Sequence, residues 1–368
     1  MEREVYASEV RERTLQERRQ SYFSKYTSVY RTDKNVRILI VPGHDEKHFG
    51  AQHDGVKEYE LNRQVAVTLY ELLRKEPGFS VAITSNNEGY TNIFESFFTE
   101  HENDIDEFMR QAKRSFENKI EKGKIDFEET NFHNYAPSGA AQKLYGINLW
   151  SNENDFDLVI HIHFNDYAGR YKDRNPKHNG FSIYIPDEQF KNFEMSKNFA
   201  DKVFERMKEY FPVSKLEQEK SGIIESQELI AIGSKESLDA ASMLIEYGYI
   251  YEPHFTNPDT RDFVMEDLAR KTYLGIKDYF GEGSLDVESY VFDEDLFEKE
   301  KGWNEGNYQL QKELVKKGFF PPQGKTLNDC PVSGLFGKCT KDAVIDFQKE
   351  NNLPPTGYVG ELTRALLI

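Results

Sequence analysis

The chain alternates short apolar runs with longer amphipathic stretches. The run at residues 36–41 stops at Pro42 and Gly43, which predicts a buried strand ending in a turn. Apolar residues at helical spacing follow over residues 62–73, and a second apolar run occupies residues 79–83. A strand, a helix and a strand in this order predict an α/β domain with parallel strands.

The same alternation continues to about residue 280. It predicts strands at 158–164, 181–185 and 241–246, and helices near 140–149, 190–210 and 261–280. Residues 93–122 carry an apolar residue every three or four positions, which predicts one long helix with a single apolar stripe. We expect the stripe to pack on the domain; a lid over a cleft is the alternative. The fold class predicted is α/β, with a twisted, mostly parallel sheet flanked by helices.

Changes in composition divide the chain into segments. We expect a charged N-terminal helix or arm at residues 1–34 and an α/β catalytic domain at 35–280, with a helical insertion at about 95–138. An acidic linker is expected at 281–302 and a small all-α domain of three helices at 303–368. In the last segment, helical spacing predicts a core of Leu310, Leu314, Val344, Phe347 and Leu366.

Overall charge and apolar content exclude several classes of protein. The 47 Lys and Arg residues stand against 64 Asp and Glu, a net charge of −17, which argues against a nucleic-acid binder. No apolar run approaches the roughly 20 residues that span a bilayer. The first 20 residues have no apolar signal core. We therefore expect either that the protein is not secreted by the signal-peptide route or that the signal was removed from this chain. Accumulation in the cytoplasm before export is a further option.

Histidines and carboxylates gather where predicted elements begin or end. His44 follows the turn after the first strand, at the sheet edge where open α/β sheets bind ligands. His161 and His163 point to one face of their strand. Carboxylates lie at the start of the first helix, at Glu58 and Glu60, and at the end of an apolar strand, at Glu246. Histidines and a carboxylate with one open position suit a catalytic zinc ion, but spacing alone favours partly buried histidines that are satisfied by hydrogen bonds.

The local sequences resolve this choice. Residues 40–44 (IVPGH), 55–62 (GVKEYELN), 157–165 (DLVIHIHFN) and 244–249 (LIEYGY) resemble, in order, four segments of the zinc-dependent N-acetylmuramoyl-L-alanine amidases, an AmiC-like family of peptidoglycan hydrolases. In that family a strand runs into Pro-Gly-His and a Gly-x-x-Glu segment opens the first helix. The four segments together make the resemblance specific.

The resemblance implies a role for each matching position. The zinc ligands would be His44, Glu58 and His163, and Glu246 would be the catalytic carboxylate. His161 stands where the family commonly has Ser. We expect His161 and Asn165 to support a ligand through hydrogen bonds or to meet the substrate, and His161 stays open as an alternative ligand. Residues 45–48 (DEKH) replace the family's usual glycines and add charge and stray ligands at the mouth of the site.

Residues 303–368 resemble the small peptidoglycan-binding domain of wall hydrolases, through segments such as 334–337 (GLFG). This resemblance implies wall binding. The amidase resemblance implies the reaction, in which zinc-activated water cleaves the amide between N-acetylmuramic acid and the L-alanine of the stem peptide. The alternatives are a zinc peptidase acting on stem peptides and a catalytically inactive wall-binding or anchoring protein. The partner expected is peptidoglycan, and we expect a monomer.

Two cysteines precede the second helix of the C-terminal domain. A bridge between Cys330 and Cys339 would close a short loop, which the chain-entropy model values at about 2–3 kcal/mol. Reduced thiols are the alternative. Two cysteines exclude a multi-cysteine zinc site, and their pairing would favour an oxidising compartment, so we expect an extracellular or cell-envelope location.

Overall fold

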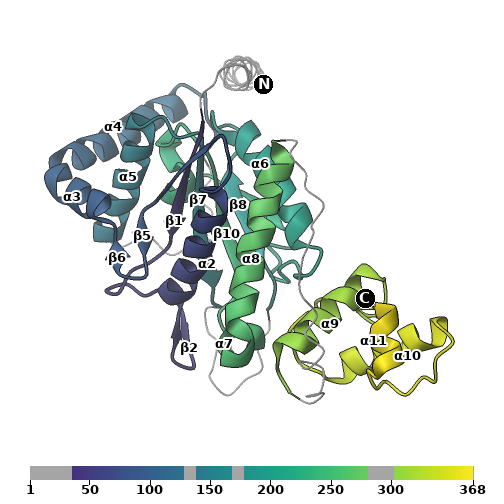
Figure 1. The fold of residues 1–368 in the computed structure, drawn as a ribbon. Helices are drawn as coiled ribbons and strands as arrows, with labels where there is room; N and C mark the ends of the chain where they lie inside the picture. The colour runs from purple at the N-terminus through teal and green to yellow at the C-terminus, as the bar shows by residue number, and fades with distance from the viewer. Residues whose placement is uncertain (1–34, 128–137, 168–177, 281–301, 368) are drawn as a thin grey trace, which may run out of the picture.

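The structure is a computed structural model that describes residues 35–127, 138–167, 178–280 and 302–367. The predicted N-terminal arm at 1–34 and nearly all of the predicted acidic linker at 281–302 lie outside the described residues. The described chain comprises an α/β domain and a small helical domain (Figure 1). None of the described helices combines the length and apolar character that crossing a bilayer requires.

A six-stranded sheet forms the centre of the α/β domain. Its strands, in spatial order, are β4 (Phe79–Ile83), β1 (Val36–Pro42), β7 (Leu158–Asn165), β10 (Ala241–Tyr249), β8 (Ser182–Pro186) and β9 (Ile223–Ser226). Only the β10–β8 pair is antiparallel. The predicted mostly parallel α/β sheet is therefore confirmed, with β9 as a strand that the pattern did not predict. Two short hairpins accompany it: β2 (Gln52–His53) with β3 (Val56–Lys57), and β5 (Ser85–Asn86) with β6 (Gly89–Tyr90).

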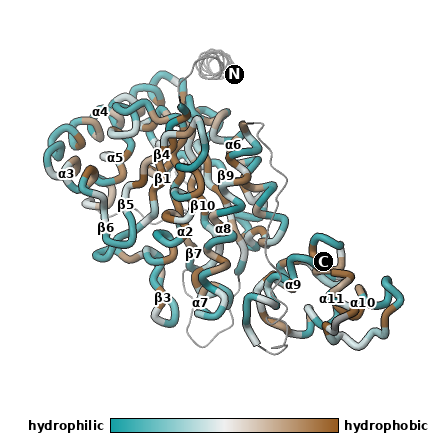
Figure 2. Tube along the Cα trace, viewed as in Figure 1, coloured by the Kyte–Doolittle hydropathy of each residue, from teal (hydrophilic) through white to brown (hydrophobic). Residues whose placement is uncertain are grey.

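Helices cover both faces of this sheet (Figure 1). The helices α2 (Glu58–Leu73), α6 (Phe193–Met207) and α8 (Pro258–Tyr279) bury the side chains of Ile38, Ile160 and their neighbours. On the other face, α3 (Asn92–Glu100) and α5 (Ser138–Glu153) cover Leu39, Val41 and Val159. Because both faces are covered, the central strands are apolar along most of their length, and Figure 2 shows them largely in brown. The short helical segments are η1 (Ile230–Ile232), η2 (Ser234–Glu236) and α7 (Pro253–Thr256).

The predicted single helix over residues 93–122 is wrong in one respect, because it is two helices. These are α3 (Asn92–Glu100) and α4 (Glu102–Glu121), separated at His101, whose backbone is not helical. The break lets Phe97 of α3 and Ile105 of α4 pack together on α5, around Tyr145. One straight helix would carry its stripe away from this neighbour. The described helices pack on the domain as the amphipathic stripe predicts.

The C-terminal domain consists of α9 (Glu305–Lys316), α10 (Lys338–Glu350) and α11 (Glu361–Leu367). Leu310, Leu314, Val344 and Phe347 are buried as predicted. Leu366 is 45 % exposed, so its predicted core position is wrong, and Leu367 occupies the core instead. The short α11 presents its neighbouring leucine inward. Cys330 and Cys339 form a disulfide bond that ties the loop before α10 to that helix.

The two domains contact each other through α8 and α9. Lys312 Nζ lies 2.9 Å from Asp267 Oδ1, and the Tyr308 hydroxyl donates to Asp267 Oδ2 at 2.9 Å. Both charged side chains are fully buried. The Phe263 ring packs on Tyr308 beside this pair. We call the Asp267–Lys312–Tyr308 contact the interdomain clamp. A buried ion pair keeps both partners in place, because separating them strands a charge.

Candidate metal centre

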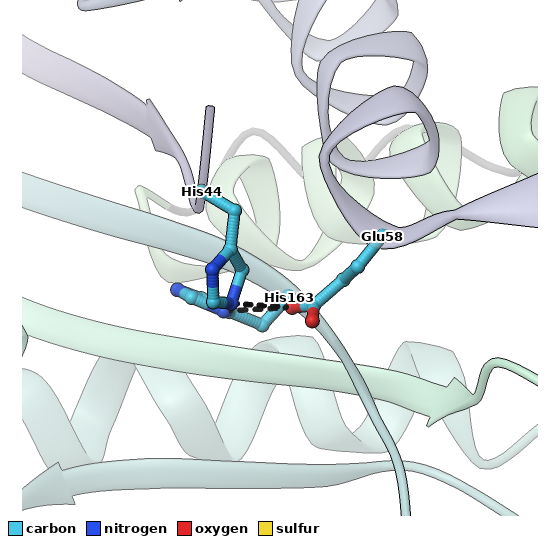
Figure 3. A group of neighbouring side chains, drawn as sticks. All are labelled: His44, Glu58 and His163. Carbon is cyan, nitrogen blue, oxygen red and sulfur yellow. Dashed lines mark hydrogen bonds and ion pairs between the residues drawn. The ribbon is translucent and has the colours of Figure 1, made fainter. Parts of the chain in front are cut away.

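Three side chains converge at the carboxyl edge of the sheet, where β1 and β7 end and α2 begins (Figure 3). Glu58 Oε1 lies 3.2 Å from His44 Nε2 and 3.0 Å from His163 Nδ1. One ligand atom from each residue lies within 4.8 Å of the other two. Glu58 and His163 are mostly buried, whereas the His44 side chain is 32 % exposed. The group is therefore accessible from one side.

Glu58 is held by the backbone as well as by the histidines. Its Oε2 accepts from the Ala51 amide at 2.8 Å, and its Oε1 accepts from the Phe164 amide at 3.3 Å. The hairpin of β2 and β3 leads directly into the start of α2, which fixes where the Glu58 side chain begins. A carboxylate with this many partners keeps one orientation.

Two glycines make room for the group. A Cβ on Gly43 would lie 2.1 Å from His163 Cε1, and a Cβ on Gly50 would lie 2.2 Å from Glu58 Oε2. Gly50 also has a φ of +72°, a region that favours glycine. The Gly43 amide donates to the Ile162 carbonyl at 2.9 Å, which places the turn directly against β7. The glycine of the Pro-Gly-His turn is thus required by the close approach of the His163 ring.

His44 itself adopts a left-handed backbone conformation, with φ of 66°. Such a conformation in a residue other than glycine is uncommon and requires support from its surroundings. Asn62 of α2 supplies part of it, because its Nδ2 donates to the Gly43 carbonyl at 2.8 Å. Asp45 supplies more, since its Oδ1 accepts from the amides of Lys47 and His48 at 3.0 and 2.8 Å.

The charged segment at residues 45–48 is anchored rather than loose. Lys143 of α5 donates to Asp45 Oδ2 at 2.9 Å, and the Lys143 ammonium also lies over the Tyr90 ring. Glu46 pairs with the buried Arg63 of α2. Among the described residues, the metal-ligand group contains neither Asp45 nor His48. The charges that replace the family's glycines tie the His44 turn to two helices.

Burial and mutual charge shift the pKa values of the three converging groups. Burial alone would raise the pKa of the Glu58 carboxyl, but hydrogen bonds from His163 and His44 outweigh it and hold that pKa well below its usual value. Burial lowers the pKa of His163, although Glu58 opposes this. Burial also acts to lower the pKa of His44, but the bond to Glu58 outweighs it and the net shift is upward. A fixed anionic carboxylate between two imidazoles is a donor set suited to a divalent cation.

Glu246 lies on β10 directly opposite His163 on β7, so the two side chains project from the same face of the sheet. Its Oε2 is buried and has no hydrogen-bond partner within the part of the chain that the structure describes. Burial, followed by the negative charges of Glu58 and Glu219, raises the pKa of Glu246 well above its usual value. Glu246 is therefore a half-buried residue with a buried Oε2, and it lies beside the metal-ligand group but outside it.

The remaining predicted site residues take other places. His161 is fully buried between Val41 and Leu244 of the neighbouring strands, and neither ring nitrogen has a hydrogen-bond partner in the described residues. Burial lowers the pKa of His161 to about 3, so the ring is neutral. The expected hydrogen-bonded support is not seen there. Glu60 is exposed and accepts from the Lys57 amide at 3.4 Å, outside the metal-ligand group.

Asn165 leads to a residue that the sequence analysis missed. Its Nδ2 donates to Glu219 Oε1 at 3.0 Å. The buried Glu219 carboxylate also accepts from the hydroxyls of Tyr184, Ser214 and Tyr249. Ser214 lies 5 residues before Glu219, but the other donors lie 30 to 54 residues away along the chain, so no local motif indicates the cluster. Glu219 contributes negative charge to the surroundings of Glu246.

The fold and the site can now be set beside known proteins. Residues 38–278, well over half of the chain, match the family model of N-acetylmuramoyl-L-alanine amidases. The chain belongs to this family. Residues 305–367 match the family model of a peptidoglycan binding domain. The amidase thus combines a catalytic domain with a second domain of the class that binds the same polymer.

Solved amidase structures align with this chain at low sequence identity. An N-acetylmuramoyl-L-alanine amidase from Clostridium difficile 630 is 17 % identical, with a TM-score of 0.42, over 68 % of this chain and 100 % of that one. The CwlD amidase of Clostridioides difficile, solved with the GerS lipoprotein, is 18 % identical, with a TM-score of 0.43, over 67 % and 99 %. The amidase Ami1 of Mycobacterium smegmatis is 13 % identical, with a TM-score of 0.44, over 68 % and 99 %.

Proposed function

We propose that this peptidoglycan amidase is a zinc enzyme in which His44, Glu58 and His163 hold the metal. The observation that carries the proposal is the convergence of two imidazole nitrogens and one carboxylate oxygen within 4.8 Å of one another. Two histidines and a glutamate, with a fourth position left for water, are a donor set of catalytic zinc sites. When bound, zinc would polarise the scissile carbonyl and acidify a water molecule.

The chain's own residues divide the remaining work. Glu246 accepts a proton from the attacking water and returns it to the nitrogen of the leaving L-alanine. Its position opposite His163 supports this role, as does the unpartnered Oε2. The pKa of Glu246 is raised by burial, which is the direction that favours a general acid–base group over a permanently ionised carboxylate. The interactions of Asp45 and Asn62 keep His44 in its strained turn.

The substrate bond and the site of action follow from the same proposal. The amide cleaved is the one that joins the lactyl group of N-acetylmuramic acid to L-alanine. Because peptidoglycan lies outside the cytoplasmic membrane, the protein acts in the envelope or outside the cell, and we propose that it does so as a monomer. Size-exclusion chromatography with light scattering tests the oligomeric state.

Two measurements on purified full-length protein test the function. Elemental analysis should find about one zinc per chain, and mass spectrometry of digested peptidoglycan should find free stem peptides that begin with L-alanine. Cleavage within the stem, with the lactyl amide intact, would instead identify a peptidase. A protein that binds no zinc and releases no fragment, yet sediments with the wall, would be an inactive binding protein.

A further inference from the structure

A cavity of 480 Å³ lies at the junction of the two domains. Tyr251 and Pro253 line it from the catalytic domain, and Trp303, Leu335 and the Cys330–Cys339 bridge line it from the C-terminal domain. This volume falls in the range of small-molecule sites, about 300–1,000 Å³. Neither domain forms the cavity alone, because each supplies one wall.

The walls are held in place by contacts between the domains. The interdomain clamp at Asp267 and Lys312 fixes α9 against α8. Closer to the cavity, Asn179 Nδ2 and Lys215 Nζ both donate to the Asn328 carbonyl, at 3.4 and 3.2 Å. Asn328 Nδ2 returns a hydrogen bond to the Val213 carbonyl at 3.3 Å. A preformed cavity binds its ligand without the cost of ordering loops.

The charged side chains on the rim are already engaged within the protein. Lys215 donates to a backbone carbonyl, and Lys338 pairs with Asp342 one helical turn away. Asp329 accepts from the amide and hydroxyl of Thr326. Glu252, also on the rim, accepts from two backbone amides. This engagement favours a ligand without net charge.

We propose that the cavity binds a neutral sugar unit of the peptidoglycan glycan strand. A pyranose ring has an apolar C–H face that fits against aromatic side chains such as Trp303 and Tyr251. Its hydroxyl groups can donate to Oδ1 of the lining residue Asn328, a buried atom that has no hydrogen-bond partner among the described residues. The stem peptide carries free carboxylate and ammonium groups, which would need uncommitted charges. The inference rests on the proposed function, since it names the part of the polymer that the enzyme holds while it cuts.

The cavity adjoins the edge of the sheet that carries the metal-ligand group. The Tyr251 ring packs edge-on against His53, with ring centres 6.3 Å apart. His53 belongs to the hairpin that leads into Glu58. A glycan strand held in the cavity therefore lies beside the elements that build the metal centre.

The sequence offers a direct optical test, because it contains only two tryptophans. Trp150 packs on Phe94 and Phe156, in the apolar layer between α5 and the sheet. In a Trp150→Phe variant of the full chain, Trp303 alone reports the cavity. Titration with the tetramer of N-acetylglucosamine should change its emission saturably. No change at millimolar tetramer, or an equal response to a free stem peptide, would overturn the proposal.

Variants on both walls test whether the site is shared. Trp303→Ala and Tyr251→Leu should each weaken tetramer binding about tenfold or more, as expected of a buried aromatic anchor, when binding is measured by calorimetry. Trp303→Phe should retain most of the tetramer binding, because it keeps an aromatic ring at this position. This result would distinguish the loss of the ring from misfolding of the variant. Tyr358→Ala is the matched control, because Tyr358 is 57 % exposed in the same domain and does not line the cavity. An equal loss of tetramer binding in the control, or unchanged tetramer binding by Tyr251→Leu, would contradict a site shared by both domains.

The same variants distinguish this inference from the proposed function. Trp303→Ala should keep its zinc content and should lose more activity on long glycan strands than on a small soluble muropeptide. Tetramer binding by a protein without amidase activity would refute the function and leave the cavity assignment standing.

Discussion

The ring of His163 lies directly against the backbone of Gly43, in the space that any other side chain would occupy. Gly43→Ala would place a methyl group 2.1 Å from His163 Cε1, so the ring must move away from Glu58. We expect zinc affinity and activity to fall together, by roughly 10- to 100-fold. Zinc titration with a competing chelator measures the first quantity. Gly139→Ala is the control, since nothing lies within 4 Å of a Cβ there.

Glu246→Gln separates proton transfer from metal binding. The substitution keeps the shape of the side chain and removes its basic carboxylate, so zinc content and wall binding should stay near normal. Activity should fall by about 10²–10⁴-fold. His163→Ala is the comparison, because it should lose zinc and activity together. If Glu246→Gln loses zinc as fully as His163→Ala, Glu246 is a ligand; if it stays active, another group carries the proton.

Lys143→Met tests the support of the His44 turn. Burial acts to raise the pKa of Asp45, but the bond from Lys143 outweighs it, and the net pKa is lowered. Without Lys143 the Asp45 side chain loses its link to α5, and the left-handed His44 loses part of its support. We expect activity to fall about tenfold, the lower end of effects seen for residues that orient ligands. Lys119→Met, which breaks the pair with Glu236 between α4 and η2, should leave activity unchanged.

Part of this architecture could be predicted from the sequence, because its signals are local. The strand that ends in Pro42 and Gly43 is visible as an apolar run before a turn, and the spacing of His161 and His163 indicates one strand face. The structure brings His44, Glu58 and His163 together, while their roles stay proposals. The amphipathic stripe of residues 93–122 predicted a helical segment packed on the domain, but it did not predict the break at His101.

The remaining features depend on contacts between distant segments. The break at His101 arises because α3 and α4 both pack on α5, which the helical periodicity does not register. Glu219 collects its donors from four separate segments. Lys312 looks like one more charged residue of an amphipathic helix, and only the docking onto α8 shows that it is buried.

Lys312→Met tests the interdomain clamp. It leaves the Asp267 carboxylate buried without its cation, which for a buried pair costs about 3–5 kcal/mol. We expect the substitution to weaken the contact between the domains, seen as a lower midpoint of unfolding in urea. The double variant Asp267→Leu with Lys312→Met should recover much of the loss, because it removes both charges. A single variant as stable as the parent would show that the clamp does not hold the domains.

Glu252→Gln tests the pH dependence of stability. Burial raises the pKa of Glu252 to about 7. The unfolded chain releases this proton near pH 4.3, so between about pH 4.3 and 7 the folded state binds more protons and stability falls as pH rises. Gln can still accept from the amides of Tyr249 and Gly180, and it does not titrate. The thermal midpoint of the variant should therefore exceed that of the parent at pH 8 by more than at pH 5.

Glu252→Ala is the control for that comparison. It removes the acceptor, and two buried amides lose their partner, so the midpoint should fall at both pH values. A Gln variant that follows the parent at every pH would show that Glu252 is not the titrating group.

The clamp between α8 and α9 has a consequence for which stem peptides along a glycan strand the enzyme can cleave. If the clamp holds the two domains in this arrangement, the fold sets the distance between the proposed sugar site and the metal-ligand group. A catalytic domain joined to the binding domain by a flexible linker would cleave any stem peptide within reach, and the spacing between cleaved positions would vary. A fixed distance would select stem peptides at one separation and one rotational orientation along a glycan strand. Cleavage would then occur at regular intervals, and the spacing of the cleaved positions would reflect the distance between the two sites.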